Sequence, residues 1–176
     1  MYSLTLSTLV SDLAHLGQEE KVLFPKLKPY VLGNRGGFSI INLERTLNQL
    51  NIGLRIVRNI CLAGGRILVL ESRIDRANIA QFYFSGIKSV TFKKNWRGGS
   101  LTNNEGLSDS LPDLILIFGG SEHRSVIKEA ARLGIPVVGV VDTDCDLLGI
   151  DYPILCNSIS LTSLVLYYRL FSKAAG

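Results

Sequence analysis

The chain contains 176 residues, of which 47% are hydrophobic and 19% are charged, and its formal net charge is +4. This length predicts one compact domain, or one domain with an arm, and the apolar fraction excludes a disordered chain. Apolar runs such as Leu114–Phe118 are much shorter than the roughly 20 residues that a transmembrane helix requires. The 3 cysteines form no Cys-x-x-Cys pair, which disfavours zinc ribbons and thioredoxin chemistry and indicates reduced thiols.

The start of the chain does not resemble a targeting segment. The first twenty residues contain no Lys or Arg but include Asp12, Glu19 and Glu20, unlike a secretory signal or an Arg-rich transit peptide. We therefore expect a chain that is mature, cytosolic, or made in the compartment where it works.

Charge is unevenly distributed along the chain. Residues 31–105 carry eleven basic and four acidic side chains, whereas residues 106–176 carry five basic and eight acidic ones. This pattern predicts a basic middle that contacts a polyanion and a C-terminal third that does not. The alternative interpretation is an unevenly charged, solvated surface.

The first thirty residues are typical of an arm or a short helical segment, because several leucines have helical spacing before Pro25 and Pro29 interrupt regular structure. Gly33–Gly37 then form a flexible basic turn. We expect an N-terminal arm over residues 1–32 and a single domain over residues 33–176.

The clearest helix signal follows Asn42, a favourable N-cap residue. Apolar residues from Leu43 to Cys61 recur at steps of four and three, which predicts an amphipathic helix over residues 43–61. Ser72-x-x-Asp75 is typical of a capping box and predicts a second helix through Phe84. Further helices are expected over residues 121–134 and 160–174.

Short apolar runs alternate with these helices. The predicted strands cover residues 66–70, 89–92, 113–118, 136–141 and 153–156. Continuously apolar strands between helices are typical of a mainly parallel sheet covered on both faces. The sequence therefore predicts a three-layer α/β/α domain.

Gly119-Gly120-Ser121 lies between a predicted strand and a predicted helix, where α/β folds bind phosphates. Asp142 follows the next strand, where an acid could bind a ribose. Two of the three glycines of the dinucleotide fingerprint are missing, and Glu122 would repel a phosphate. A tight turn is the favoured interpretation; a nucleotide-binding enzyme using Gly119, Gly120 and Asp142 is the alternative.

Two further candidate sites carry weak signals. Asp142–Asp146 has oxygen ligands on alternate residues but lacks the glycine and glutamate of a calcium loop, so capping and turn formation are favoured over a magnesium site. His15 and His123 are the only histidines, and no nucleophile elbow accompanies them, so structural or RNA-facing roles are favoured over catalysis.

The segment Lys93–Asn103 places the only tryptophan, Trp96, among three basic residues and two glycines. Lys and Arg neutralise phosphates, and a tryptophan can stack on a base or fill an apolar slot. We interpret the basic residues as RNA-facing. For Trp96, we favour a packing role over a contact with a base.

Taken in order, several segments resemble the small-subunit ribosomal protein two family of the bacterial and organellar type. The most specific are Gly-Gly-x-Leu-Thr-Asn, Leu-Gly-Ile-Pro and Val-Asp-Thr. The matching segments are Ala14–Gly17, Ile40–Thr46, Gly65–Val69, Trp96–Asn103, Pro112–Leu114, Glu129–Val137, Val141–Asp144 and Asp151–Ile154.

This resemblance implies a flavodoxin-like domain that binds small-subunit rRNA and neighbouring ribosomal proteins near the head–body junction. It implies no catalysis, cofactor, metal, membrane or small-molecule substrate. The expected RNA-binding residues are Arg35, Arg73, Arg76, Lys93, Lys94, Trp96, Arg97 and Asn103.

The chain departs from the family pattern in length and in a few residues. Family members of the bacterial type carry a long helical hairpin after the Leu-Thr-Asn motif, whereas only about nine residues separate Asn103 from Pro112 here. Gln18 stands where a second histidine is expected, and Asn95 where an Arg usually precedes the tryptophan. A member without the hairpin or a transit peptide resembles a mitochondrial ribosomal protein encoded in the organelle, with a plastid or bacterial protein as the alternative.

Overall fold

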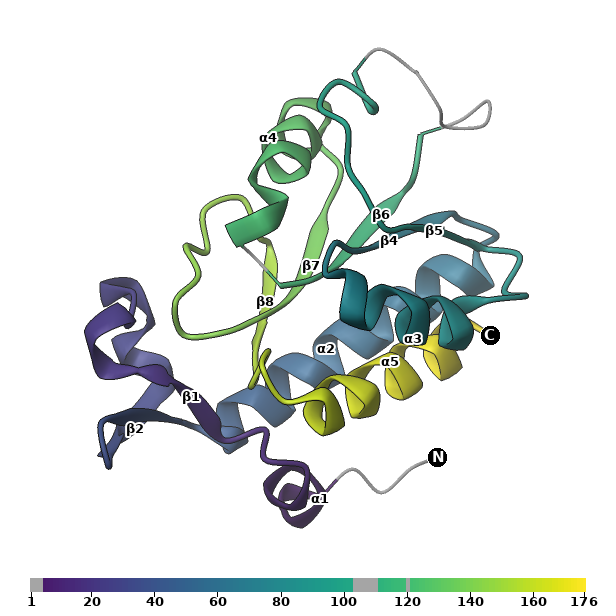
Figure 1. The fold of residues 1–176 in the computed structure, drawn as a ribbon. Coiled ribbons are helices and arrows are strands. Elements are labelled where there is room, and N and C mark those ends of the chain that lie inside the picture. Colours follow the sequence, from purple (N-terminus) through teal and green to yellow (C-terminus); the bar gives the residue numbers. More distant parts are fainter. Residues whose placement is uncertain (1–4, 103–110, 120) are drawn as a thin grey trace.

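The computed structural model describes residues 5–102, 111–119 and 121–176, and it contains two β-sheets (Figure 1). The N-terminal part consists of α1 (Leu6–Ser11), β1 (Leu16–Glu19), β2 (Val31–Arg35) and β3 (Phe38–Ile41), with 3₁₀ helices over Glu20–Val22 and Pro25–Tyr30. The remaining elements are α2 (Leu43–Leu62), β4 (Ile67–Glu71), α3 (Ile74–Phe84), β5 (Val90–Lys93), β6 (Leu114–Phe118), a 3₁₀ turn over Ser121–His123, α4 (Arg124–Leu133), β7 (Val137–Val141), β8 (Tyr152–Leu155) and α5 (Leu161–Ala175).

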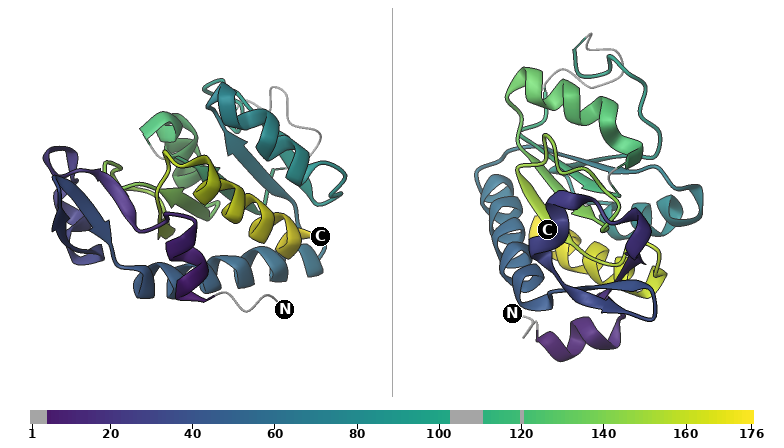
Figure 2. Two further views of the ribbon diagram at one scale, coloured as in Figure 1. Left: turned by 60° about the horizontal axis from the view of Figure 1, so that its bottom comes forward. Right: turned by 90° about the vertical axis from the view of Figure 1, so that its left-hand side faces the viewer.

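The main sheet has five parallel strands in the order β5-β4-β6-β7-β8. Helices α2, α3 and α5 lie on one face, and α4 lies on the other (Figures 1 and 2). This is the strand order of a flavodoxin-like, doubly wound sheet, and the predicted three-layer α/β/α fold is confirmed.

Both faces of the sheet contribute to the core. In β4, Ile67 and Val69 pack with the helices on one face, whereas Leu68 and Leu70 pack with α4 on the other. Every residue of β4, β6 and β7 is buried. This is why these strands are continuously apolar, except for Glu71 at the end of β4, rather than alternating.

The N-terminal segment folds into a small antiparallel sheet, in the order β1-β3-β2. The basic turn predicted over residues 33–37 is confirmed only in part, because residues 33–35 pair with β3 as part of β2. Gly36 and Gly37, with φ values of 60° and 85°, form the tip of the β2–β3 hairpin. The expected boundary between residues 32 and 33 falls within β2, and β3 leads directly into α2.

In the part of the chain that the structure describes, no helix has the length and apolar character needed to cross a membrane.

The helix predictions are confirmed, with one correction. The side chain of Asn42 caps α2 by accepting hydrogen bonds from the backbone N–H groups of Glu44 and Arg45. The capping box predicted at Ser72 is wrong, because α3 begins at Ile74 and its N-cap, Arg73, makes no side-chain capping bond.

Helix α2 approaches the sheet closely at Gly53. A Cβ atom at this position would lie 2.9 Å from Cδ1 of Ile154 and 3.5 Å from Cγ1 of Val138, so little room exists for a side chain. We expect Gly53→Val to lower the free energy of unfolding by about 2 kcal/mol, the usual cost of overpacking a core. Urea denaturation measures this change. Asn59→Val places the same β-branched residue at an exposed position of α2, so equal losses in both variants would contradict the prediction.

Candidate nucleic-acid interface

The loop that follows β5 is held against α4 by one buried carboxylate. Oε1 of Glu129 accepts hydrogen bonds from Nε1 of Trp96 (3.1 Å) and from the backbone N–H of Gly99 (2.9 Å). Oε2 accepts from the backbone N–H of Leu101 at 3.0 Å. Burial opposes ionisation of Glu129, but these hydrogen bonds outweigh it and lower its pKa. A single side chain of α4 therefore fixes the conformation of the basic loop.

Trp96 is one of the residues fixed in this way. Its ring is half-buried and packs against the core beneath α4, and its only polar atom is bonded to Glu129. Nζ of Lys93 lies 5.7 Å from the centre of the ring, within cation–π range. The expected packing role of Trp96 thus agrees with its surroundings, and its side chain also positions a basic neighbour.

The exposed cations of this region come from α3 and from the loop after β5. Lys94 donates to Oδ1 of Asn78 on α3 at 2.8 Å, which joins the loop to that helix. Arg97 is exposed, and Arg73 at the start of α3 lies 3.8 Å from Glu122 in a solvent-exposed ion pair. Such a pair contributes little to stability and can exchange for a phosphate.

The structure does not add the other expected RNA contacts to this group. Arg35 ends β2 in the N-terminal sheet, which lies on the opposite side of the molecule from α3 and β5 (Figures 1 and 2). Asn103 lies outside the described residues. Arg76 is buried, and its guanidinium donates to the carbonyl groups of Ser158 and Ile159, so it is removed from the candidate interface as a correction.

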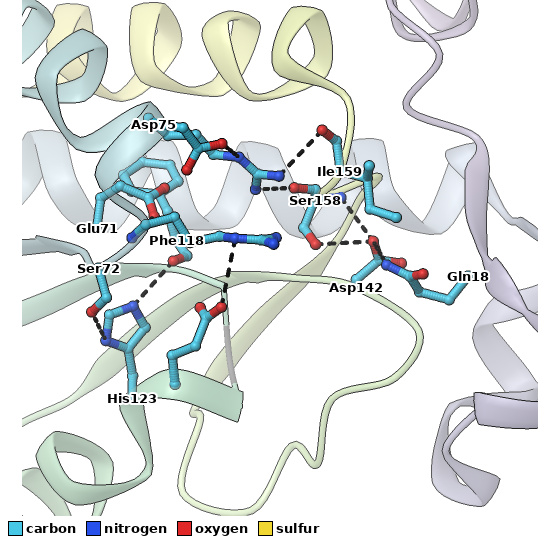
Figure 3. Close-up of polar contacts among 12 residues, drawn as sticks. Gln18, Glu71, Ser72, Asp75, Phe118, His123, Asp142, Ser158 and Ile159 are labelled. Carbon is cyan, nitrogen blue, oxygen red and sulfur yellow. Dashed lines mark hydrogen bonds and ion pairs between the residues drawn. The ribbon is translucent and has the colours of Figure 1, made fainter.

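The carboxyl ends of β4 and β6 form the crevice where doubly wound folds bind nucleotides. In this chain, buried side chains at these strand ends hydrogen-bond to one another and to the backbone (Figure 3). Nε2 of His123 lies 3.1 Å from the carbonyl oxygen of Phe118, and its Nδ1 lies 3.4 Å from the hydroxyl of Ser72. Since a carbonyl only accepts, Nε2 carries the proton and Nδ1 accepts from Ser72. Burial lowers the pKa of His123, which favours this neutral form.

Glu71, at the end of β4, completes this buried group. It accepts from the hydroxyl of Tyr168 at 2.6 Å and from the backbone N–H of Arg73 at 3.1 Å. Burial raises the pKa of Glu71 despite these bonds. The hydroxyl of Ser72 faces His123 rather than the start of α3, which explains the absence of the predicted capping box.

Asp142 connects three separate segments of the chain (Figure 3). Its Oδ2 accepts from the backbone N–H of Ser158 (2.8 Å), from the hydroxyl of the same residue (3.0 Å) and from the side-chain amide of Gln18 (3.2 Å). Its Oδ1 accepts from the backbone N–H of Thr143 at 2.7 Å. Burial raises the pKa of Asp142, although the bonds from Thr143 and Ser158 oppose this shift. The residue ties the N-terminal segment and the turn before α5 to the end of β7.

These contacts argue against the nucleotide-binding alternative. The carboxylate of Asp142 is buried and engaged by protein donors, so it is not presented to a ribose. At Gly119, Oε2 of Glu122 lies 2.8 Å from where a Cβ would be, which places an acid against the expected phosphate position. Gly120 lies outside the described residues.

The other two candidate sites also have structural explanations. Asp146 accepts from the backbone N–H of Leu148 at 3.1 Å, the turn-forming role expected for this loop. Among the described residues, no group of three or more His, Cys, Asp or Glu side chains is placed to hold a metal ion. The carbonyl of His15 accepts from the backbone N–H of Ile41 and so links the N-terminal segment to β3.

The sequence analysis did not identify the hydrogen-bonding roles of Glu129, which fixes the loop after β5, or of Gln18 and Ser158, which bond to Asp142. Glu129 lies in a helix, where a glutamate is usually solvated, and its partners precede it by about thirty residues. The one available signal was its position: the buried residues Val126 and Ala130 flank it on the same helical face.

Comparison with known proteins decides the family. The sequence profile of the family described as ribosomal protein S2 matches residues 9–111 and 105–176. This chain belongs to the ribosomal protein S2 family. The two S2 matches meet at residues 105–111, the segment where the sequence predicts that the helical hairpin is missing.

Individual S2 relatives agree with the profile. The small ribosomal subunit protein uS2 of Bartonella henselae is 27% identical over 216 residues, covering 97% of this chain and 84% of the relative. The uS2 proteins of Sinorhizobium medicae (28%; 97% of this chain and 85% of the relative) and Brucella ovis (26%; 99% and 87%) are similar. The aligned stretches are longer than this chain, so these S2 proteins contain additional residues within them.

Proposed function

We propose that this S2-family chain is a structural constituent of the small ribosomal subunit and binds small-subunit rRNA and neighbouring ribosomal proteins. The observation that carries the proposal is the family match, which extends over nearly the whole chain. Buried polar groups at the carboxyl ends of β4 and β6 bond to other groups of the protein, which supports a binding and structural role rather than catalysis. The proposal includes no cofactor, metal or small-molecule substrate.

The RNA-facing surface that we propose is formed by Arg73, Lys93, Lys94 and Arg97. Asn78 and Glu129 hold the loop that carries Lys94 and Arg97, so the charges of these two residues are presented in a fixed arrangement. A preorganised cationic surface loses less conformational entropy when it binds a phosphate backbone. Arg35 would form a separate contact from the N-terminal sheet.

We further propose that this protein works in mitochondrial ribosomes, near the junction of the head and the body of the subunit. The two family matches meet at residues 105–111, where the helical hairpin is expected to be missing, and this supports the subtype. The similar uS2 proteins reported above are bacterial, so a bacterial cytoplasm is the alternative, as is a plastid.

Sedimentation tests the proposed function directly. The tagged chain is expected to co-migrate with the small subunit in a sucrose gradient of the lysate and to remain bound through a moderate salt wash. Migration at the top of the gradient without RNA would overturn the proposal. Fractionating isolated organelles separately from the cytoplasm distinguishes the mitochondrial, plastid and bacterial alternatives.

The surface itself is tested by replacing Lys93, Lys94 and Arg97 with alanine. We expect weaker binding to small-subunit rRNA and a salt dependence of log K that is shallower by about two, because each lost phosphate contact removes roughly 0.7 to 0.9 from the slope. Filter binding over a salt series measures this change. Replacing Lys21, Lys26 and Lys28 with alanine removes three exposed charges from the N-terminal segment and serves as the control. Equal salt slopes of log K for the two triple variants would contradict the assignment of Lys93, Lys94 and Arg97 to the RNA-facing surface.

A further inference from the structure

A second basic surface lies at the amino ends of the strands of the main sheet, whereas the loop after β5 lies at their carboxyl ends. The C-terminal ends of α2 and α5 lie side by side there (Figures 1 and 2), next to the turns that lead into β4 and β5. They enclose an open groove of about 1330 Å³, which we call the amino-edge groove. Its charged lining residues are Arg55, Arg58, Arg66, Lys88 and Lys173.

The charged side chains of the amino-edge groove are all of one sign, and Gly176, the last residue of the sequence, also lines it. Five basic side chains line it, all exposed, and no acidic side chain does. The carboxylate of Asp113, directly before β6, accepts a hydrogen bond from the backbone N–H of Arg66 at 2.8 Å. Across the described residues, the ion pairs found involve Arg73 and Arg76 rather than Arg55, Arg58, Arg66 or Lys88. Clustered like charges repel one another, so such a groove favours an anionic partner.

Local structure does not explain this clustering. Cations stabilise the last turn of a helix, and Lys173 occupies such a position in α5. The last turn of α2 contains no basic residue, because Arg55 and Arg58 lie further from its end. Arg66 and Lys88 lie outside the helices, after turns in which Gly64 and Gly86 have φ values of 78° and 80°. Four of the five charges therefore have no helix-capping role.

We propose that the amino-edge groove binds an RNA phosphate backbone, as a second contact separate from the loop after β5. The inference rests on the proposed ribosomal function and adds a surface at the amino ends of the strands. Arginine predominates in the groove, and its planar guanidinium donates two parallel hydrogen bonds to a phosphate. Arg55 and Arg58 project from one helical face, and the open space beside Gly64 and Gly86 lets a polymer approach the rim.

The test compares two triple variants of the full chain. Arg55, Arg58 and Lys88 are changed to alanine in one, and Lys21, Lys26 and Lys28 in the other, so both lose three exposed positive charges. The probe is small-subunit rRNA of the source organism, transcribed in vitro, with filter binding over a salt series. We expect the groove variant to bind at least about tenfold more weakly than the control variant, with a salt slope shallower by about two. Circular dichroism and thermal unfolding establish that both variants are folded.

Each result has a distinct meaning. Equal affinity and slope for the two variants, with strong binding by the unchanged chain, would overturn the groove proposal and leave the ribosomal function intact. If the unchanged chain bound no rRNA and failed to co-sediment with the subunit, the proposed function itself would fail. Normal RNA binding by the groove variant, combined with loss of incorporation into subunits, would mean that the groove binds an acidic protein, which also overturns the proposal.

Discussion

Glu129→Ala is expected to lower the free energy of unfolding by about 3 kcal/mol, because it leaves several buried donors without an acceptor. The indole N–H of Trp96 and the backbone N–H groups of Gly99 and Leu101 all donate to this carboxylate. Leu101 is buried beneath α4, so its amide cannot turn to solvent without the loop detaching. Detachment would also expose Trp96, and its fluorescence is expected to shift to longer wavelength. Urea denaturation followed by this fluorescence measures both effects.

Lys128→Ala provides the matched control, since it removes a charged side chain from the adjacent, exposed position of α4. We expect that variant to change stability by less than about 0.5 kcal/mol, as surface substitutions usually do. If the two alanine variants lost stability equally, the anchoring role of Glu129 would be contradicted. Weaker rRNA binding by folded Glu129→Ala would further show that the fixed conformation of the loop contributes to recognition.

The contribution of Glu129 to the free energy of unfolding should also depend on pH. Its pKa is lowered in the folded protein, so folding favours the ionised form. The stabilisation is therefore present above the ordinary value of 4.5 and is lost as the pH falls through the lowered pKa. The stability difference between the unchanged chain and Glu129→Gln is expected to shrink over that acidic interval. A difference that stayed constant or grew on acidification would contradict the assigned sign.

Asp142→Ala is the second change with a large expected effect, again about 3 kcal/mol, because backbone donors would be left unpaired in a buried site. The N–H groups of Thr143 and Ser158 and the amide of Gln18 converge on this carboxylate. Loss of the Gln18 contact should loosen the N-terminal segment before the main sheet unfolds. Amide hydrogen exchange is expected to be faster in β1 than in β7.

Asp142→Asn sharpens this test, because the side chain keeps its shape but exchanges one acceptor oxygen for a donor. In either orientation its NH₂ group faces a backbone N–H, so we expect a loss of at least about 1 kcal/mol. Asp144→Asn makes the same change at an exposed position of the same loop and should be nearly neutral. Similar behaviour of the two asparagine variants would refute the connecting role of Asp142.

Much of the fold follows from short-range pattern. Apolar steps of three and four residues predict α2, and its cap follows from the chemistry of Asn42 alone. Continuous apolar runs predict all five strands of the main sheet to within about two residues, because both faces of a parallel sheet are covered. The α3 capping box was wrong because the hydroxyl of Ser72 is used by His123, about fifty residues away.

The sequence by itself determined the class of fold, the family and the basic character of the middle of the chain. Only the tertiary structure decided which charges are available. Arg76 is buried and donates to two carbonyl groups, and Glu129 orders the loop that carries Trp96. The basic residues of the middle of the chain are divided between the carboxyl ends and the amino ends of the strands of the main sheet. The physical reason is that periodicity and capping depend on neighbours a few residues apart, whereas burial and hydrogen-bond partnership depend on segments that meet only when the sheet has formed.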